Sequence, residues 1–348
     1  YAAVNAAVDQ AKAADGVAAG RFVNGLLRNV LRSKDHLPEP DRTNPVTYIS
    51  VMTAHPEWMV RRWLARFGEE ATLALCRGNN ETPPMTLRVN CLKTTRDRLS
   101  DALRAVEGDV VPTALSPEGL IVKGVSVTQL PAFGRGEFYI QDEGAQLAAY
   151  LVNPEAGERI LDVCAAPGGK TTHLAELSGG RAVVTATDID DDRLNLLKDN
   201  VARLETPGVH VEKMETALSP GRLYDKIIVD APCSALGILR RIPEGKWWKK
   251  VSSIQNFAAT QLEILESVLL HLKTGGRLIY VTCSTEREEN EDVVEAFSKE
   301  HQALCLEDPS ADLPPEARGF VNEQGYFTTM LNSDRMDRFF AVRWIKKR

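Results

Sequence analysis

The sequence predicts an α/β protein with a mostly parallel sheet, preceded by a small α+β module and a helical segment. From about residue 143, short apolar runs alternate with helical patterns, which is typical of parallel strands joined by crossover helices. Residues 84–140 combine short extended runs with one helix, and residues 1–80 carry apolar side chains at helical spacing. A composition of 43% hydrophobic and 26% charged residues excludes collagen-like and disordered chains. The length of 348 residues suggests about two domains.

The first part of the chain is predicted to be helical and interrupted by proline. Val23, Leu27 and Val30 share one helical face, and three prolines between residues 38 and 45 mark a linker after it. We therefore place domain boundaries near residues 40 and 142. Because position 1 is tyrosine and lies inside a helical pattern, we also expect a segment upstream of this sequence.

The later elements follow in order. In the α+β module we expect an extended run, a helix and three short strands at 85–90, 95–106, 110–113, 119–122 and 137–140. In the parallel sheet we expect strands at 159–164, 182–187, 208–213, 225–229 and 276–282. A helix with one apolar face, 254–272, precedes the last of these strands. Two late runs, 326–331 and 338–345, predict an antiparallel hairpin that completes the sheet.

Charge is distributed unevenly along the chain. The net charge of −6 argues against a nucleic-acid partner, but residues 286–323 hold twelve acids and three bases, so the remainder is near +3. Residues 236–250 are basic and contain two tryptophans. Bases beside aromatic rings suit single-stranded nucleic acid, and a solvated loop with two core tryptophans is the alternative. The residues concerned are Arg240, Arg241, Lys246, Trp247 and Trp248.

Several classes of protein are disfavoured. The six cysteines form no Cys-x-x-Cys pair and have no histidine at ligand spacing, so we expect free thiols and no metal site. No run approaches the roughly 18 apolar residues of a membrane-spanning helix, and the start lacks the layout of a signal peptide. We therefore expect a cytoplasmic protein that does not engage a membrane.

A glycine-rich turn follows the first strand of the predicted sheet, where open α/β sheets bind ligands. Small residues let a ligand approach the backbone, and the next helix offers free N–H groups. A Walker A loop is disfavoured because Cys164 occupies the place of its first glycine, and a dinucleotide-binding Gly-x-Gly-x-x-Gly motif is lacking. The candidate ligand-binding residues are Cys164, Ala165, Ala166, Pro167, Gly168, Gly169 and Lys170.

The second strand ends near Asp188, twenty residues beyond Gly168, where an acid in nucleotide-type folds accepts both ribose hydroxyls. Asp190 is expected instead to begin the next helix, where acids favour the positive end of the helix dipole. A ribose carboxylate without a phosphate-binding loop indicates an adenosine that carries no phosphate chain. S-adenosylmethionine fits this description.

Two cysteines follow the last two strands of the parallel sheet. One lies in Asp-Ala-Pro-Cys-Ser at 230–234, and the other in Thr-Cys-Ser at 282–284. A cysteine behind a strand is ordinarily a buried apolar residue. Two of them at adjacent strand ends, in front of a methyl donor, favour catalysis.

Together these motifs resemble the RNA cytosine-C5 methyltransferases of the Sun/Fmu (NSUN) family. The motifs concerned are Gln141–Glu143, Asp162–Lys170, Asp188, Asp230–Ser234, Thr282–Ser284 and Glu289–Glu291. Arg21–Arg32 and Pro56–Trp58 further resemble the bacterial 16S ribosomal RNA branch, and the resemblance covers essentially the whole chain. It implies the end of a helical NusB-like RNA-binding domain at 1–40. Linker helices and an RNA-binding α+β module would follow at 41–142, and a Rossmann-like methyltransferase domain at 143–348.

The resemblance assigns roles to the catalytic residues. Cys283 would attack carbon 6 of cytosine, because carbon 5 is a poor nucleophile until the ring is activated, and Cys233 would assist the later elimination. Asp230 would lie against the N3/N4 edge of the base. Lys170 would favour the thiolate and contact the base.

The resemblance also implies ligands and partners. S-adenosylmethionine is the expected cofactor, and Arg193, Glu215 and Asp230 join its site. Glu215 would be a shifted substitute for the Asp of a Gly-Asp pair usual in the family. The partner is 16S ribosomal RNA of the small subunit, held beside the target base by residues 240, 241 and 246–248, and we expect a monomer. Three alternatives stay open: a catalytically silent RNA-binding assembly factor, a methyltransferase for another RNA such as tRNA, and one for a protein or small molecule.

Overall fold

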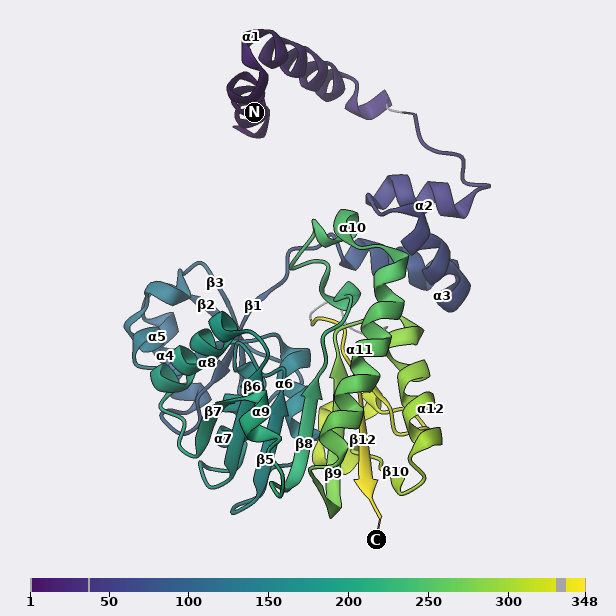
Figure 1. Ribbon diagram of the computed structural model, residues 1–348. Helices are drawn as coiled ribbons and strands as arrows, with labels where there is room; N and C mark the ends of the chain where they lie inside the picture. The colour runs from purple at the N-terminus through teal and green to yellow at the C-terminus, as the bar shows by residue number, and fades with distance from the viewer. Residues whose placement is uncertain (1, 37, 330–335, 348) are drawn as a thin grey trace. The chain divides into compact units, whose positions relative to one another are not determined.

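The computed structural model describes residues 2–36, 38–329 and 336–347, drawn as ribbon in Figure 1. The chain divides into two units, Tyr1–Leu73 and Ala74–Arg348. Within the described ranges, no helix is long and apolar enough to cross a membrane.

The first unit is helical, as the spacing of its apolar residues predicts. Its elements are α1 (Ala2–Arg32), η1 (Lys34–His36), α2 (Pro45–Thr53) and most of α3 (Glu57–Gly78). α1 bends at Gly16, whose φ of 81° lies outside the helical region. The predicted linker lies between η1 and α2. Pro45 is the first residue of α2, a position that its fixed φ suits.

The second unit begins with a four-stranded antiparallel sheet in the order β2-β3-β1-β4, which confirms the predicted α+β module. Its elements are β1 (Met85–Val89), α4 (Arg96–Arg104), β2 (Asp109–Pro112), β3 (Gly119–Lys123), η2 (Val127–Gln129), α5 (Pro131–Gly134) and β4 (Phe138–Ile140). Side chains alternate along a strand, so Leu87 and Val89 join a core with Leu99 and Leu103 of α4. Arg88, between them, lies on the opposite face of the sheet.

A larger sheet follows, in the order β10-β12-β9-β8-β5-β6-β7, with β11 paired to β12. Its strands are β5 (Arg159–Val163), β6 (Val183–Asp188), β7 (Val209–Lys213), β8 (Tyr224–Asp230), β9 (Leu272–Thr282), β10 (Leu304–Leu306), β11 (Phe327–Thr328) and β12 (Phe340–Lys346). β5 to β9 pair in parallel, and β12 is antiparallel to β9, β10 and β11. The five predicted parallel strands and the pairing of the late runs are confirmed. The turn of this hairpin, expected at 332–334 between the two late runs, lies outside the described residues, and β10 was not predicted.

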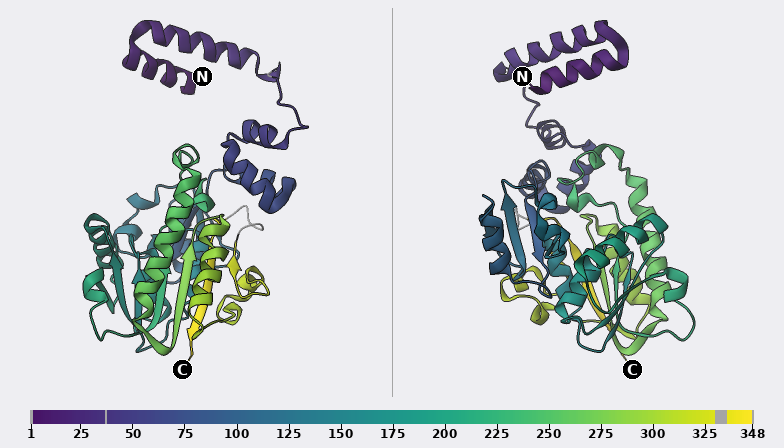
Figure 2. Two further views of the ribbon diagram at one scale, coloured as in Figure 1. Left: turned by 45° about the vertical axis from the view of Figure 1, so that its right-hand side comes forward. Right: turned by 90° about the vertical axis from the view of Figure 1, so that its left-hand side faces the viewer.

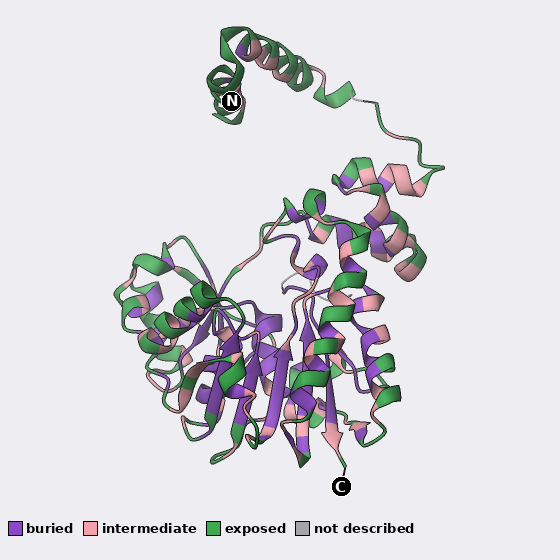
Figure 3. Ribbon diagram, viewed as in Figure 1, coloured by how far each residue is buried: buried purple, intermediate pink, exposed green. Residues whose placement is uncertain are grey.

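Helices lie on both faces of the larger sheet (Figure 2). The helical elements of this part of the chain are α6 (Glu143–Tyr150), α7 (Gly169–Leu177), α8 (Asp191–Leu204), α9 (Met214–Ala217), η3 (Leu236–Ile238), α10 (Gly245–Trp248), α11 (Val251–Leu269), η4 (Arg287–Glu289), α12 (Glu291–Glu300), η5 (Ser310–Asp312) and η6 (Pro315–Phe320). Leu161 and Ile227 belong to one core with α11 and α12, whereas Ile160 and Ile228 belong to a second core with α6 and α7. The central strands are therefore buried on both faces (Figure 3), which explains their continuous apolar runs.

Candidate active site

The site residues gather at the carboxyl ends of the parallel strands. The glycine-rich turn follows β5, Asp188 ends β6, Glu215 follows β7, Asp230 ends β8 and Cys283 follows β9. Because these strands are parallel, their carboxyl ends meet at one edge of the sheet. Glu215 lies exposed in the first turn of α9.

The two cysteines lie in contact. Their Sγ atoms are 3.3 Å apart, and neither is in a disulfide. The hydrogen bond with Cys233 and, after it, desolvation raise the pKa of the half-buried Cys283 thiol well above its ordinary value. The ammonium of Lys170 lowers this pKa, but the opposing effects outweigh it. The thiol is therefore the favoured form of Cys283.

A buried carboxylate joins the two cysteine-bearing loops. Glu289 accepts hydrogen bonds from the backbone N–H of Ser234, at 2.6 Å, and from the hydroxyls of Ser234 and Ser284. Asn290 accepts from the hydroxyl of Thr282 at 2.6 Å and donates to the carbonyl oxygen of Ser284 at 3.0 Å. This pair fixes the residues that flank both cysteines. Glu289 and Asn290 belong to a motif recognised in the sequence. Because Glu289 lies within an acidic segment, its position in the sequence did not indicate that it is buried.

Lys170, in the first turn of α7, and Asp230, at the end of β8, form an ion pair. The Lys170 Nζ lies 2.7 Å from Asp230 Oδ2, and the two side chains are 9% and 33% exposed. Burial lowers the pKa of Lys170, but the Asp230 carboxylate raises it more, so the pKa lies above its ordinary value. The ammonium also lies 5.3 Å from the centre of the Phe339 ring. Lys170 is therefore a charged group beside the acid predicted to face the base.

The glycine-rich turn requires its small residues. Gly168 has a φ of 101° as the N-cap of α7, and Cys164 also has a positive φ, of 60°. A Cβ at Gly168 would lie 2.5 Å from Cδ1 of Leu197. At Gly169 it would lie 3.1 Å from the ring of Tyr139. A larger residue at either position would displace the turn.

Asp188 and Arg193 both hold the glycine-rich turn. Asp188 Oδ2 accepts from the backbone N–H of Ala166 at 3.2 Å and lies 3.3 Å from Arg193 Nη2. Arg193 donates to the carbonyl oxygen of Ala166 at 2.8 Å. From the described residues, Asp188 Oδ1 accepts a single long bond, 3.4 Å, from the backbone N–H of Asp190, so it can take a further donor. Asp190 caps α8, as predicted.

Asp162 is a site residue to which the sequence assigned no separate role. One of its carboxylate oxygens accepts from the hydroxyl of Thr171 at 2.6 Å, while the other is buried without a hydrogen-bond partner among the described residues. Burial raises the pKa of this carboxyl to about 7. An unpaired buried carboxylate oxygen is costly unless a donor reaches it, and a cationic ligand group would do so. The position of this acid inside an apolar strand is the sequence feature that could have indicated a role for Asp162.

The predicted RNA-binding residues divide into two groups. Arg240 is buried, and it donates to Asp337 at 2.6 Å, while Arg241 donates to Asp142 at 2.8 Å. Lys246 is also buried and donates to Asn80. All three basic side chains therefore donate hydrogen bonds to acceptors within the protein that are far away along the chain. Trp247 and Trp248 are exposed, at 62% and 73%, which excludes the alternative of two core tryptophans.

The acids that hold this arginine pair lie close together. Asp142 Oδ1 accepts from the backbone N–H of Asp337 at 2.9 Å, so the two carboxyls share one site. Burial and the charge of Asp337 raise the pKa of Asp142 to about 6, against the lowering effect of Arg241. In the described ranges, no group of three or more His, Cys, Asp or Glu is placed to hold a metal ion.

Comparison with known proteins agrees with this arrangement. Residues 149–344 match a family model described as 16S rRNA methyltransferase RsmB/F, and residues 55–128 match the ferredoxin-like domain of RsmF/B-like methyltransferases. The probable ribosomal RNA small subunit methyltransferase B of Bacillus subtilis is 35% identical over 99% of this chain and 78% of its own length. The ribosomal RNA small subunit methyltransferase B of Pectobacterium atrosepticum is 34% identical over 93% and 73%.

A solved structure supports the same fold. The methyltransferase homolog protein from Pyrococcus horikoshii is 25% identical, with a TM-score of 0.72 over 88% of this chain and 99% of that one. The first family model covers more than half of the chain, and relatives above 30% identity align with nearly all of it. The chain therefore belongs to the RsmB/F (Sun/Fmu) family of 16S rRNA methyltransferases.

Proposed function

We propose that this protein transfers a methyl group from S-adenosylmethionine to carbon 5 of a cytosine in 16S ribosomal RNA, through a covalent bond between Cys283 and carbon 6. The observation that carries the proposal is the 3.3 Å contact between the thiols of Cys233 and Cys283 at adjacent strand ends. The Lys170–Asp230 pair lies at the same edge of the sheet. A single structural cysteine would need neither arrangement.

The residues of the site divide the chemistry between them. The Cys283 thiol loses its proton and its sulfur adds to carbon 6, which places the electron pair of the double bond on carbon 5. Asp230 shares a proton with the N3/N4 edge of the base as negative charge develops there. Carbon 5 would take the methyl group as the bond between that group and the cofactor's sulfonium sulfur breaks. Water or a basic side chain then accepts the proton on carbon 5, the electron pair of that bond re-forms the double bond to carbon 6, and the sulfur of Cys283 leaves as a thiolate. Cys233, in contact with Cys283, assists this elimination.

S-adenosylmethionine would be held by the glycine-rich turn and two carboxylates, and it supplies the methyl group. Asp162 has a buried oxygen in need of a donor, which suits the ammonium of the methionine end. Asp188 Oδ1 accepts one long hydrogen bond from Asp190, at 3.4 Å, so its remaining acceptor capacity suits a ribose hydroxyl. Both acids therefore fit a cofactor that carries an amine and a ribose but no phosphate.

The RNA would be held outside this site by Trp247 and Trp248. Their exposed rings offer stacking surfaces for unpaired bases, and Lys249 and Lys250 add positive charge beside them. Arg240 and Arg241 would act indirectly, by holding this loop to Asp142 and Asp337. The target base must be unpaired or flipped out to reach Cys283.

Transfer of labelled methyl groups tests the proposal. The protein is incubated with labelled S-adenosylmethionine and unmodified 16S rRNA, and the modified nucleoside is identified by mass spectrometry. We expect 5-methylcytidine. RNA binding without transfer would support the silent assembly factor, transfer to tRNA alone would support another RNA substrate, and transfer without RNA would support a protein or small-molecule methyltransferase.

A further inference from the structure

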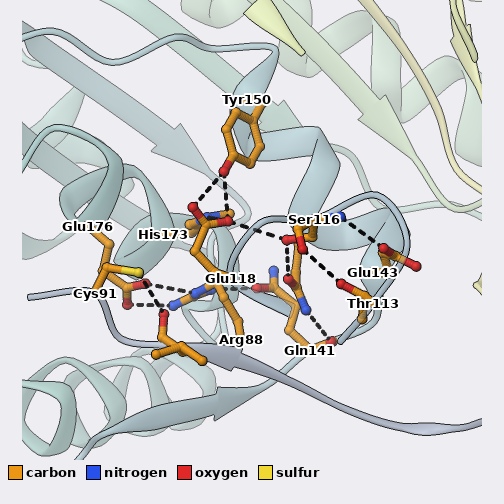
Figure 4. Close-up of polar contacts among 12 residues, drawn as sticks. Arg88, Cys91, Thr113, Ser116, Glu118, Gln141, Glu143, Tyr150, His173 and Glu176 are labelled. Carbon is orange, nitrogen blue, oxygen red and sulfur yellow. Dashed lines mark hydrogen bonds and ion pairs between the residues drawn. The ribbon is translucent and has the colours of Figure 1, made fainter. Parts of the chain in front are cut away.

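A buried arginine of the small sheet contacts the first turn of α7. Figure 4 shows Arg88, on β1, among polar groups contributed by the small α+β module and by helices α6 and α7. Its side chain is fully buried, and its Nε and Nη2 atoms donate to the carboxylate of Glu176 at 3.0 and 2.8 Å. A buried guanidinium persists only when its donors are paired.

The remaining donors of Arg88 reach the glycine-rich turn and its surroundings. Nη1 donates to the carbonyl oxygen of Gly169 at 2.5 Å and to the side chain of Gln141. Nη2 also donates to the hydroxyl of Thr172 at 2.8 Å. That hydroxyl in turn donates to the carbonyl oxygen of Gly168 at 2.8 Å. All five N–H donors of the guanidinium are therefore used, and they lead to both glycines of the turn.

The same sheet also packs against the turn. A Cβ at Gly169 would lie 3.1 Å from the ring of Tyr139 and 3.2 Å from Nε2 of Gln141. Tyr139 belongs to β4, and its ring centre lies 5.3 Å from the guanidinium carbon of Arg88. Lys170, the next residue after this contact, forms the ion pair with Asp230. The small sheet thus contacts the residues that lead directly into the catalytic pair.

We propose that Arg88 is a positioning residue that orients Gly168–Lys170, so that cofactor binding depends on the seating of the small sheet against α7. This inference rests on the proposed binding of S-adenosylmethionine by the glycine-rich turn. Lysine at position 88 would keep the charge but lose the planar fork, and one ammonium cannot reach Glu176, Thr172 and Gly169 together.

A matched arginine separates positioning from stability. Arg343 on β12 is 2% exposed and pairs with Asp312 at 2.6 Å and Glu307 at 2.7 Å. Its carboxylate partners lie outside the glycine-rich turn. Arg343→Lys therefore removes a comparable buried fork without disturbing the proposed cofactor site.

The test measures S-adenosylmethionine binding to the full chain by calorimetry, with thermal unfolding of each variant alongside. We expect Arg88→Lys to weaken affinity by about tenfold or more, whereas Arg343→Lys lowers the unfolding temperature but leaves affinity within about twofold. Thr172→Val, which removes the bridging hydroxyl, should weaken affinity in the same direction and decides the matter if Arg88→Lys does not fold.

The outcomes separate this inference from the proposed function. Wild-type protein that binds no S-adenosylmethionine would overturn the proposed cofactor and the inference with it. Wild-type protein that binds, with both Arg88→Lys and Thr172→Val matching Arg343→Lys in affinity, would overturn the positioning role alone.

Discussion

Gly168→Ala tests the close packing of the glycine-rich turn. Gly168 has a φ of 101°, which side chains disfavour, and a Cβ there would lie 2.5 Å from Cδ1 of the buried Leu197. The backbone conformation costs about 1–2 kcal/mol and overpacking adds about 1–3 kcal/mol. We therefore expect the free energy of unfolding to fall by about 2–5 kcal/mol. Affinity for S-adenosylmethionine should fall as well, because the turn must shift.

Gly275→Ala is the matched control for this prediction. Gly275 has a φ of 78°, but no atom lies within 4 Å of a Cβ built there, so only the backbone cost of about 1–2 kcal/mol applies. Urea unfolding measures both variants, and calorimetry measures cofactor binding. Equal destabilisation by the two substitutions would refute the reasoning. So would the absence of favourable coupling, of about 1 kcal/mol, when Leu197→Ala accompanies Gly168→Ala.

Two further predictions concern other parts of the site. Replacing Trp247 and Trp248 with alanine should weaken RNA binding by about 1–3 kcal/mol for each stacked base while sparing cofactor affinity; unchanged binding in a filter assay would exclude them from the RNA surface. The pKa of Asp162 is raised from 3.8 to about 7, so the native state binds a proton that the unfolded chain releases, and this stabilisation is lost as pH rises from about 4 to 7. Asp162→Asn should remove that part of the pH dependence of unfolding and weaken cofactor binding; an unchanged pH profile would contradict the assignment.

Much of the fold could be predicted from the sequence because the local pattern of apolar residues matches the side chains that are buried in the tertiary structure. β8 and the second half of β9 are buried on both faces, and both contain nearly uninterrupted apolar runs, whereas β7, at the edge of the sheet, is only partly buried. β10 was missed because it has three residues, Leu304–Leu306, within the acidic segment 286–323, and it pairs with β12. A strand this short carries no periodic signal of its own.

Site residues could be predicted where a sequence motif lies at the end of a strand. They could not be predicted where a residue far along the chain determines what a side chain contacts. Cys233 and Cys283 were predicted to meet because their strands are neighbours. Arg240 was predicted to bind RNA, but its side chain is buried and donates to Asp337, 97 residues away. Arg88 reads as a residue in an extended run, and its contact with Gly169 spans 81 residues. Such long-range pairings have no signature at the positions concerned.

The covalent step is the central claim, and trapping on RNA that contains 5-fluorocytidine tests it most directly. In this nucleoside, fluorine replaces the hydrogen on carbon 5. Release of the enzyme requires loss of that hydrogen as a proton, so an adduct formed through Cys283 persists in denaturing electrophoresis. We expect the wild-type protein to form this adduct in the presence of S-adenosylmethionine and Cys283→Ala to form none. Cys233→Ala should form an adduct even on ordinary RNA, because its attack is intact and its release is impaired.

Cys305→Ala is the matched control, since Cys305 lies on β10, away from the parallel strand ends, and should behave as the wild type. An adduct with Cys283→Ala but not with Cys233→Ala would exchange the roles of the two thiols. Folded wild-type protein that methylates its RNA yet forms no adduct with the fluorinated RNA would contradict the covalent mechanism itself.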